Sequence, residues 1–337
     1  MKIAVLSPVA WRTPPEHYGP WEQMASNLTE GLIRMGYDVT LFATGNSVTS
    51  GKLDAVIPKG YEENKSTDAK VAECLHISNL MEKADNFDLI HNHFDFLPLT
   101  YSRLIDTPII TTIHGFSSPD IVPVYEKYNS ESYYVSISQA DRREELKYLA
   151  TVYNGINVAD FTFNDRPEDF LLFFGRIHPD KGTAAAIEIA RRSNRRLIIS
   201  GIIQDAVYFK ERIEPFLNEN IVFTGHAGSE VRNQLLGKAY ALLHPINFNE
   251  PFGLSVAEAM MCGTPVIAFN RGSMPELVKS GETGYIVNSV DEAVEAVNQV
   301  TYLNRASCRD WSVSQFSCER MVGEYLKCYA HVLSNNY

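Results

Sequence analysis

The fold is decided by the stretch FLLFFGRIHPDKGTAAAIEIARR, residues 170–192. Its first five residues are apolar and Gly175 ends the run, so we expect a short buried strand at 170–174. After a loop bounded by Gly175 and Gly182, the apolar pattern predicts a helix that starts near Thr183. A strand, a loop and a helix in this order are typical of a parallel sheet covered by helices.

Similar units occur on both sides of this stretch. Downstream, we expect strands at 196–200, 220–223, 241–244, 265–269 and 284–287. Upstream, we expect strands at 3–6, 39–42, 89–91, 109–113 and 134–137. We also expect upstream helices near 21–35, 69–84 and 139–149. The apolar period fades between Asn157 and Asp169, and Asn154-Gly155 is a turn signal. The sequence therefore predicts an α/β protein with a domain boundary at about residue 155.

A chain of 337 residues fits about two domains of 100–200 residues each. We predict two lobes, 1–155 and 156–319, with a cleft between them. The stretch at 310–333 reads as a helix. We expect its end, about 320–337, to pack back on the first lobe.

Composition and charge exclude several classes of protein. With 45% hydrophobic and 21% charged residues the chain is globular, and a net charge of −11 argues against a nucleic-acid binder. The five cysteines are odd in number and form no Cys-x-x-Cys pair, which favours reduced thiols in a cytoplasmic protein. No apolar run is long enough for a transmembrane helix, and strand 3–6 starts too early for a signal peptide, so at most peripheral contact with a membrane is expected.

Two cations lie on the loop that follows strand 170–174. Arg176 and Lys181 are five residues apart, and ligands of open parallel sheets bind beyond the carboxyl ends of the strands. Arginine can bind two phosphate oxygens at once, and lysine adds a point charge. The loop is a candidate phosphate site, although two solvated loop cations would give the same pattern.

A second motif is NEPFGLSVAEAM, residues 249–260. Glu250 precedes a helix and Glu258 lies within it, separated by seven residues. We place Phe252, Gly253 and Leu254 in the first turn, where unbonded N–H groups favour an anion. Carboxylates suit the vicinal hydroxyls of a ribose or a hexose. Because apolar neighbours predict that Glu258 is buried, its carboxylate needs a partner.

Together the two motifs resemble the retaining GT-B glycosyltransferases of glycosyltransferase family 4. The resemblance extends over nearly the whole chain. It includes Gly19, His114-Gly115, Asn154-Gly155, the segment from Phe223 to His226, and the segment from Gly263 to Val266. It implies the GT-B fold, two Rossmann-like αβα lobes facing across a cleft, with the nucleotide sugar on the carboxyl-terminal lobe and the acceptor on the amino-terminal one.

The resemblance also implies roles for single residues. Arg176 and Lys181 would bind the diphosphate, Glu258 the nucleotide ribose and Glu250 the transferred sugar. The backbone at Phe252, Gly253 and Leu254 would contact sugar and phosphate. The base would lie near His226, and the reacting centre near Gly19 and His114. The catalytic candidates are thus His114, Glu250, Arg176 and Lys181, and all the residues named here except His114 are donor-binding candidates.

The amino-terminal glycine motif departs from the family pattern. This chain has Gly19-Pro20-Trp21-Glu22 where the family often has Gly-Gly-x-Glu, and proline has no N–H to offer a ligand. Tyr18 and Trp21 are candidates for stacking on an acceptor, although a hydrophobic staple at the helix start explains them equally well.

The pair His91 and His93 could share one face of a strand, as metal ligands would. No third ligand follows by spacing and no Asp-x-Asp occurs, so we expect no metal and no cofactor. His93 is kept as an acceptor candidate.

The leading hypothesis is a metal-independent hexosyltransferase. It would move a sugar from a nucleoside diphosphate sugar, with UDP favoured, to a hydroxyl of a carbohydrate, lipid or small-molecule acceptor, with retained configuration. The alternatives are a glycoside phosphorylase that uses the same cationic pocket and a non-catalytic nucleotide- or sugar-binding protein.

Overall fold

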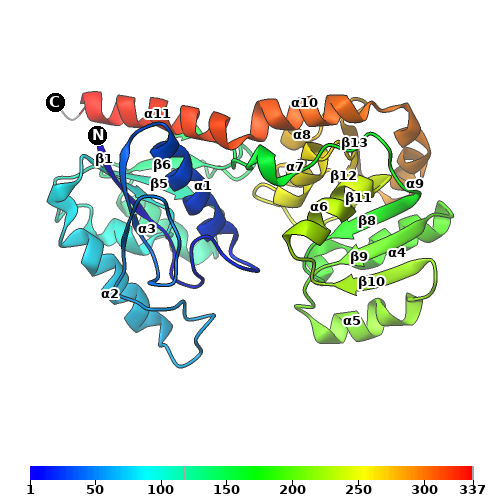
Figure 1. Ribbon diagram of the computed structural model, residues 1–337, viewed down its shortest axis with the longest axis horizontal. Helices are drawn as coiled ribbons and strands as arrows, with labels where there is room; N and C mark the ends of the chain where they lie inside the picture. The colour runs from blue at the N-terminus through cyan, green and yellow to red at the C-terminus, as the bar shows by residue number, and fades with distance from the viewer. Residues whose placement is uncertain (117, 336–337) are drawn as a thin grey trace. The chain divides into compact units, whose positions relative to one another are not determined.

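The computed structural model describes residues 1–116 and 118–335. They divide into two units. The amino-terminal unit comprises Met1–Gly155 and the chain from Cys318 onward, and the carboxyl-terminal unit comprises Ile156–Ser317. Each unit has its own parallel sheet with helices on both faces (Figure 1).

The amino-terminal unit is built on a sheet in the order β3-β2-β1-β4-β5-β6-β7, with every neighbouring pair parallel. The strands are β1 (Lys2–Leu6), β2 (Asp38–Phe42), β3 (Lys52–Asp54), β4 (Leu89–Asn92), β5 (Ile109–Ile113), β6 (Tyr133–Ser136) and β7 (Tyr148–Thr151). The helices are α1 (Pro20–Arg34), α2 (Ala69–Met81), α3 (Val122–Lys127) and α11 (Cys318–Asn335).

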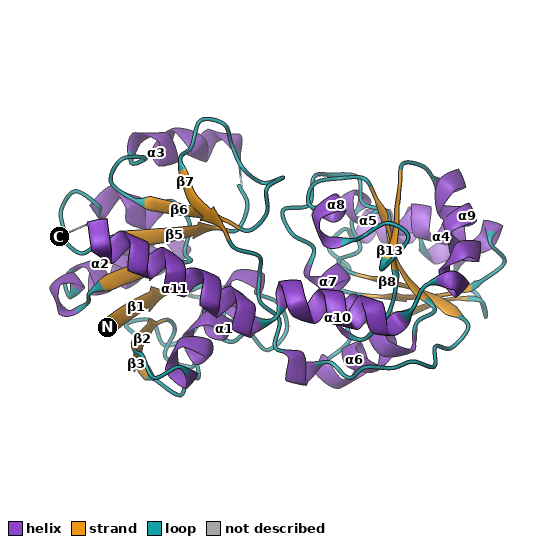
Figure 2. Cartoon of the chain, turned by 90° about the horizontal axis from the view of Figure 1, so that it is seen from above, coloured by secondary structure: helices purple, strands orange, loops and turns teal. Residues whose placement is uncertain are grey.

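Alternate residues of the buried strands supply the two faces of this sheet. Ile3 and Val5 pack with α1 and α11, whereas Ala4 and Leu6 pack with α2 on the other face. Figure 2 shows α1 and α11 on the same face of the sheet. The helix at the end of the chain is therefore part of the first core, although the whole second unit separates it from that core in sequence.

The carboxyl-terminal unit has a second parallel sheet, ordered β10-β9-β8-β11-β12-β13. Its strands are β8 (Phe170–Phe174), β9 (Arg196–Ser200), β10 (Ile221–Gly225), β11 (Ala241–His244), β12 (Val266–Phe269) and β13 (Gly284–Val287). Its helices are α4 (Thr183–Arg192), α5 (Ala206–Arg212), α6 (Ser229–Lys238), α7 (Leu254–Met261), α8 (Met274–Leu277), α9 (Val290–Gln299) and α10 (Arg305–Phe316). Strand order reverses direction between β8 and β11, which is where ligands of such sheets bind.

Two local predictions were wrong. Residues 139–149 form turns followed by β7, not a helix, because Tyr148 and Ala150 pair with β6 and extend the sheet. The single helix predicted at 310–333 is two helices, α10 and α11, separated by an extended Ser317. Ser317 forms a bridge with Ile156, so the two passages of chain between the units pair with each other.

One close approach holds α11 to α1. A Cβ atom on Gly31 would lie 2.4 Å from Cγ2 of Val322, a buried side chain of α11. Valine has little χ1 freedom with which to move away. The contact therefore requires glycine at residue 31.

We predict that Gly31→Ala lowers the free energy of unfolding by about 1–2 kcal/mol, because overpacking outweighs the gain in helix propensity. Gly323→Ala on α11 is the matched control: a Cβ atom there meets no other group within 4 Å, so this variant should be more stable by up to about 1 kcal/mol. Urea denaturation of both variants is the measurement. A stabilised Gly31→Ala variant would contradict the packing argument.

Candidate functional site

Loops from three neighbouring strands bind one another at the carboxyl edge of the second sheet. The backbone N–H of Asn247, after β11, donates to the carbonyl of Asp180, after β8, at 2.7 Å. Ser273, after β12, donates its N–H to the carbonyl of Glu250 at 3.0 Å. Gly182 has a φ of 73°, and a Cβ atom there would lie 1.8 Å from the carbonyl oxygen of Pro245. The loop that carries Arg176 and Lys181 is thus held against the loop that carries Glu250.

Lys181 and Glu250 form an ion pair within these loops, and both side chains are largely buried, at 13% and 14% exposed. The Lys181 ammonium also lies 4.7 Å from the centre of the Phe248 ring. His244 is buried, with Nε2 3.6 Å from the same carboxylate. Burial alone would raise the pKa of Glu250, but His244 and Lys181 outweigh it and lower the pKa to about 2. Glu250 is therefore an anion at neutral pH.

Arg176 has a different kind of partner. Its guanidinium donates to the amide oxygen of Gln204, which lies on the loop after β9. The two segments continue the pairing of β8 and β9, because Ile177 forms a bridge with Ile203. An uncharged amide orients the guanidinium without neutralising it, so Arg176 keeps its full charge for a ligand.

Glu258 lies inside α7 and is 9% exposed. Its carboxylate accepts from Nη1 of Arg232, on α6, at 3.3 Å, and the Arg232 guanidinium lies over the Phe161 ring. Burial raises the pKa of Glu258, and the Arg232 charge opposes this in part. Arg232 is therefore the partner that the sequence indicated this buried carboxylate needs.

The helix start differs slightly from the prediction. Gly253, with a φ of 95°, is the N-cap of α7, so the helix begins at Leu254 and Phe252 precedes it. Phe252 is buried, with its ring against Phe316 and its carbonyl oxygen accepting from the Ser273 hydroxyl at 2.6 Å. Gly253 has no side chain to cap the first turn of the helix, where N–H groups face outward. His226 lies on the exposed loop between β10 and α6.

A cavity of about 490 Å³ lies elsewhere in this unit. Its lining includes Pro167, Tyr240 and Pro265, which precede β8, β11 and β12 at the opposite edge of the sheet. Arg305, at its wall, donates to three carbonyl oxygens and to Thr264. That arginine is fully used in holding the chain together, so we do not assign the cavity to the donor site.

The other predicted residues belong to the amino-terminal unit. Gly19 has a φ of 147°, and a Cβ atom there would lie 2.8 Å from Oε2 of Glu22. Pro20 begins α1, as its missing N–H allows. Tyr18 is 40% exposed, and the Trp21 ring stacks on His114 with the ring centroids 5.7 Å apart. Gly19, Trp21 and His114 thus surround one place at the carboxyl ends of β1 and β5.

The histidines beneath Trp21 form a buried layer. Nδ1 of His91 is 2.6 Å from the Tyr329 hydroxyl, and its Nε2 is 2.8 Å from the Thr112 hydroxyl. Its Nδ1 therefore joins the sheet to α11, and its Nε2 joins β4 to β5. His93 is 1% exposed and bonds to His114, so it has no surface to offer an acceptor directly. No group of three or more His, Cys, Asp or Glu residues among residues 1–116 and 118–335 could hold a metal ion.

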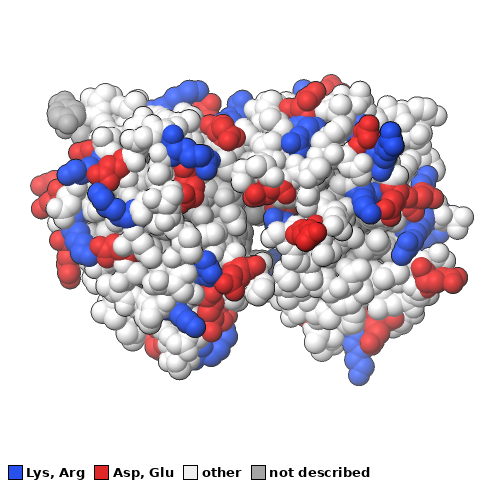
Figure 3. Space-filling model, viewed as in Figure 1, with Lys and Arg blue, Asp and Glu red and all other residues white. Residues whose placement is uncertain are grey.

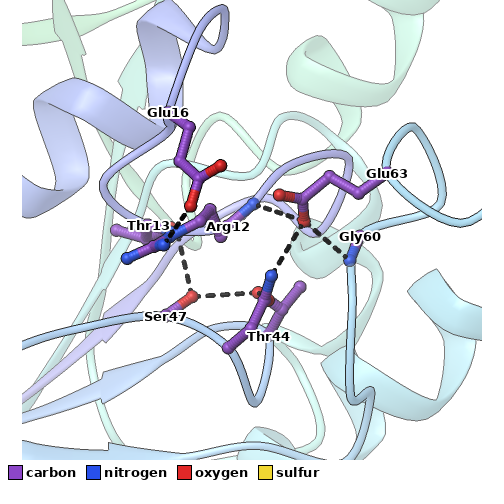
Figure 4. Close-up of polar contacts among 8 residues, drawn as sticks. Arg12, Thr13, Glu16, Thr44, Ser47, Gly60 and Glu63 are labelled. Atoms are coloured by element: carbon purple, nitrogen blue, oxygen red, sulfur yellow. Dashed lines mark hydrogen bonds and ion pairs between the residues drawn. The ribbon is translucent and has the colours of Figure 1, made fainter.

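A polar network fixes the loop between β1 and α1 (Figure 4). Oε2 of Glu63 accepts from the backbone N–H of Arg12 at 3.1 Å and from that of Gly60 at 3.2 Å. Thr13 donates its N–H to the Ser47 hydroxyl at 2.9 Å. The loop that leads to Tyr18 and Gly19 is thereby attached to the segments after β2 and β3.

Sequence reasoning missed four residues that contact the predicted ones: Gln204, Arg232, His244 and Glu22. Gln204 and Arg232 lie on other loops and helices, with no spacing signal that links them to their partners. His244 at the end of a buried strand was a detectable signal, because a polar side chain there faces the ligand edge.

The charges on the surface are mixed. On the face shown in Figure 3, Lys and Arg side chains alternate with Asp and Glu side chains over both units. No helix in the described part of the chain is long and apolar enough to cross a membrane.

Glu22 supports a prediction about pH. It is 3% exposed, and burial raises its pKa from 4.5 to about 7, although the N–H of Trp11 donates to it. The folded protein therefore holds a proton that the unfolded chain loses above pH 4.5, so this group lowers stability as pH rises from 4.5 to 7. Glu22→Gln should remove that decline, which is on the order of 3 kcal/mol.

The measurement is the free energy of unfolding of both proteins at pH 5 and pH 8. Other groups titrate equally in the two proteins, so the difference between them isolates Glu22. We expect the free energy of unfolding of the variant, relative to that of the parent protein, to be higher at pH 8 than at pH 5. Parallel pH profiles would show that Glu22 is not protonated in the folded state.

Comparisons with known proteins find glycosyltransferases. Residues 22–159 match the family model described as Glycosyltransferase Family 4, and residues 156–312 match the model described as Glycosyl transferases group 1. An uncharacterised glycosyltransferase of Methanocaldococcus jannaschii is 24% identical over an alignment of 332 residues, and the alignment covers 84% of each chain.

Two solved structures show the same fold over nearly their full length. The glycosyltransferase AviGT4, described as involved in avilamycin A biosynthesis, has a TM-score of 0.73 and 24% identity, with 99% of this chain and 98% of the other covered. HepE from Anabaena, solved with UDP-glucose, has a TM-score of 0.71 and 19% identity, with 99% and 100% covered. Two family models that together span residues 22–312, and two parallel-sheet Rossmann-like units, place this chain in glycosyltransferase family 4, with the GT-B fold.

Proposed function

We propose that this glycosyltransferase moves a hexose from a nucleoside diphosphate sugar to an acceptor hydroxyl, with retained configuration and without a metal ion. The observation that carries the proposal is the cluster at the carboxyl edge of the second sheet. There Arg176 and Lys181 follow β8, and the uncapped start of α7 follows Glu250. Cations and helix N–H groups are the protein groups that stabilise a leaving diphosphate in the absence of a metal.

The Lys181–Glu250 pair gives this site a way to respond to its substrate. When a diphosphate binds, the Lys181 ammonium can pair with it in place of Glu250. The Glu250 carboxylate can then accept hydrogen bonds from sugar hydroxyls. His244 stays beside Glu250 and limits the cost of the buried negative charge. Arg176, held by a neutral amide, needs no such exchange.

We propose UDP-hexoses as the first donors to test. The support is that HepE, a protein of the same fold, was solved in complex with UDP-glucose. Glu258 and its partner Arg232 are the groups we assign to the nucleotide ribose.

We assign the acceptor to the amino-terminal unit, where Tyr18 and Trp21 offer aromatic surface. The described chain forms no disulfide between its five cysteines, which supports our proposal of a cytoplasmic enzyme.

Loss of either cation should impair turnover. We predict that Arg176→Ala and Lys181→Ala each reduce kcat/KM by an amount equivalent to about 2–4 kcal/mol, because each removes a group that stabilises the leaving diphosphate. Lys210→Ala, which removes an exposed cation from α5 of the same unit, is the control and should leave turnover unchanged. Release of UDP from a panel of UDP-hexoses is the measurement. Normal turnover in both site variants would remove the diphosphate assignment.

Charge neutralisation by side chains also predicts the response to chelators and the stereochemistry. Turnover should survive EDTA, and an α-linked donor should yield an α-linked product, because no side-chain base is assigned to deprotonate an acceptor hydroxyl on the opposite face. Proton NMR of the fresh product gives the anomeric configuration. A β product, or loss of turnover in EDTA that manganese restores, would refute this mechanism.

A further inference from the structure

His93 and His114 lie at the ends of neighbouring strands. His93 follows β4 and His114 follows β5, and because these strands are parallel, both residues stand at the same edge. Nδ1 of His93 is 2.9 Å from Nε2 of His114, which is hydrogen-bond distance. His93 is buried beneath His114, while His114 is 8% exposed and is covered on one side by Trp21.

Both rings are neutral at physiological pH. Burial lowers the pKa of His114 to about 3 and that of His93 well below its usual value. The rings that face His93 are those of His91 and His114. Neither ring carries a negative charge that could raise the pKa of His93 again. Two neutral imidazoles share one proton across the 2.9 Å contact, so one ring donates and the other accepts.

The second nitrogen of His93 decides which ring donates. Nε2 of His93 is buried and bonds to no described residue. If His114 donated, His93 would carry its own proton on Nε2, and a buried N–H would have no acceptor. If His93 donates from Nδ1, its Nε2 carries only a lone pair.

His76 shows that this protein tolerates the second arrangement. Nε2 of His76 lies 2.9 Å from the carbonyl oxygen of Ser7 and must donate to it, because a carbonyl oxygen only accepts. Its Nδ1 therefore holds a lone pair, and that atom too is buried without a partner.

We propose that His93 is a positioning residue that fixes the tautomer of His114. With Nε2 of His114 accepting from His93, the proton of His114 sits on Nδ1, whose ring makes no other hydrogen bond among the described residues. His114 then presents an N–H to its ligand and acts as a hydrogen-bond donor to an oxygen of the substrate, not as a base. The identity of that ligand rests on the proposed function, but the tautomer does not.

The test is a two-bond ¹H–¹⁵N correlation spectrum of ¹⁵N-histidine-labelled protein at pH 7, which distinguishes the two neutral tautomers. The His114 signals are assigned from their loss in His114→Gln, and His76 is the internal reference for the Nε2–H form. We expect His93 and His114 both as Nδ1–H tautomers. A native His114 in the Nε2–H form would overturn the proposal.

Two variants link the tautomer to turnover. His93→Phe keeps a ring against His91 but removes the donor that enforces the Nδ1–H form, so a population of the Nε2–H form of His114 should appear and kcat should fall about 10- to 100-fold with little change in donor KM. His93→Asn restores an N–H donor and should recover both the Nδ1–H signal of His114 and most of kcat. An unchanged His114 tautomer in His93→Phe would overturn the proposal.

The spectra are read without substrate. A protein that turns over no nucleotide sugar would refute the proposed function and leave the tautomer assignment standing. Should His93→Phe fail to fold, the spectra of the native protein and of His93→Asn still decide it.

Discussion

The carboxyl ends of parallel strands all lie at one edge of a sheet, and the position of every candidate residue depends on this constraint. Arg176, Gln204 and Glu250 follow β8, β9 and β11, and His93 and His114 follow β4 and β5. Residues far apart in sequence come together because each crossover helix returns the chain to the same edge. The loops can then differ in chemistry while the buried strands, which are apolar on both faces, keep the fold.

Burial makes partners necessary at this edge, and the chain meets that need in different ways. Glu250 has Lys181 and His244, and its pKa falls to about 2, whereas Glu258 has Arg232 at 3.3 Å and its pKa is raised. The contacts of His244 and Lys181 with Glu250 outweigh desolvation, whereas the contact of Arg232 with Glu258 does not. A ligand hydroxyl would donate a further hydrogen bond to either carboxylate and so stabilise its buried negative charge.

The sequence predicted the two sheets because their strands are short apolar runs with clear ends, and β8 and β11 occur where the pattern placed them. Its errors have physical causes. Residues 139–149 have helix-forming composition, but pairing with β6 at the edge of the sheet outweighs that preference. Ser317 interrupts a helical pattern with neither Gly nor Pro, because its partner Ile156 lies in the other crossing segment. The candidate cations and carboxylates followed from motif spacing, whereas the partners Arg232 and Gln204 depend on tertiary contacts that no local pattern encodes.

The candidate site residues of the two units differ in their charge. The side chains assigned to the donor in the second unit include two cations, Arg176 and Lys181, and Arg176 keeps its full charge beside Gln204. The histidine layer of the first unit is held neutral by burial, with His91 bonded to hydroxyl groups and His93 bonded to His114. A neutral polar surface suits an uncharged hydroxyl, just as a cationic one suits a diphosphate, since each avoids placing an unpaired charge against its ligand. A base strong enough to deprotonate an alcohol is absent from this layer, because burial that lowers the pKa of an imidazole also makes it a poor proton acceptor. Under the proposed function, the acceptor would therefore lose its proton to a group outside the layer, such as an oxygen atom of the departing phosphate.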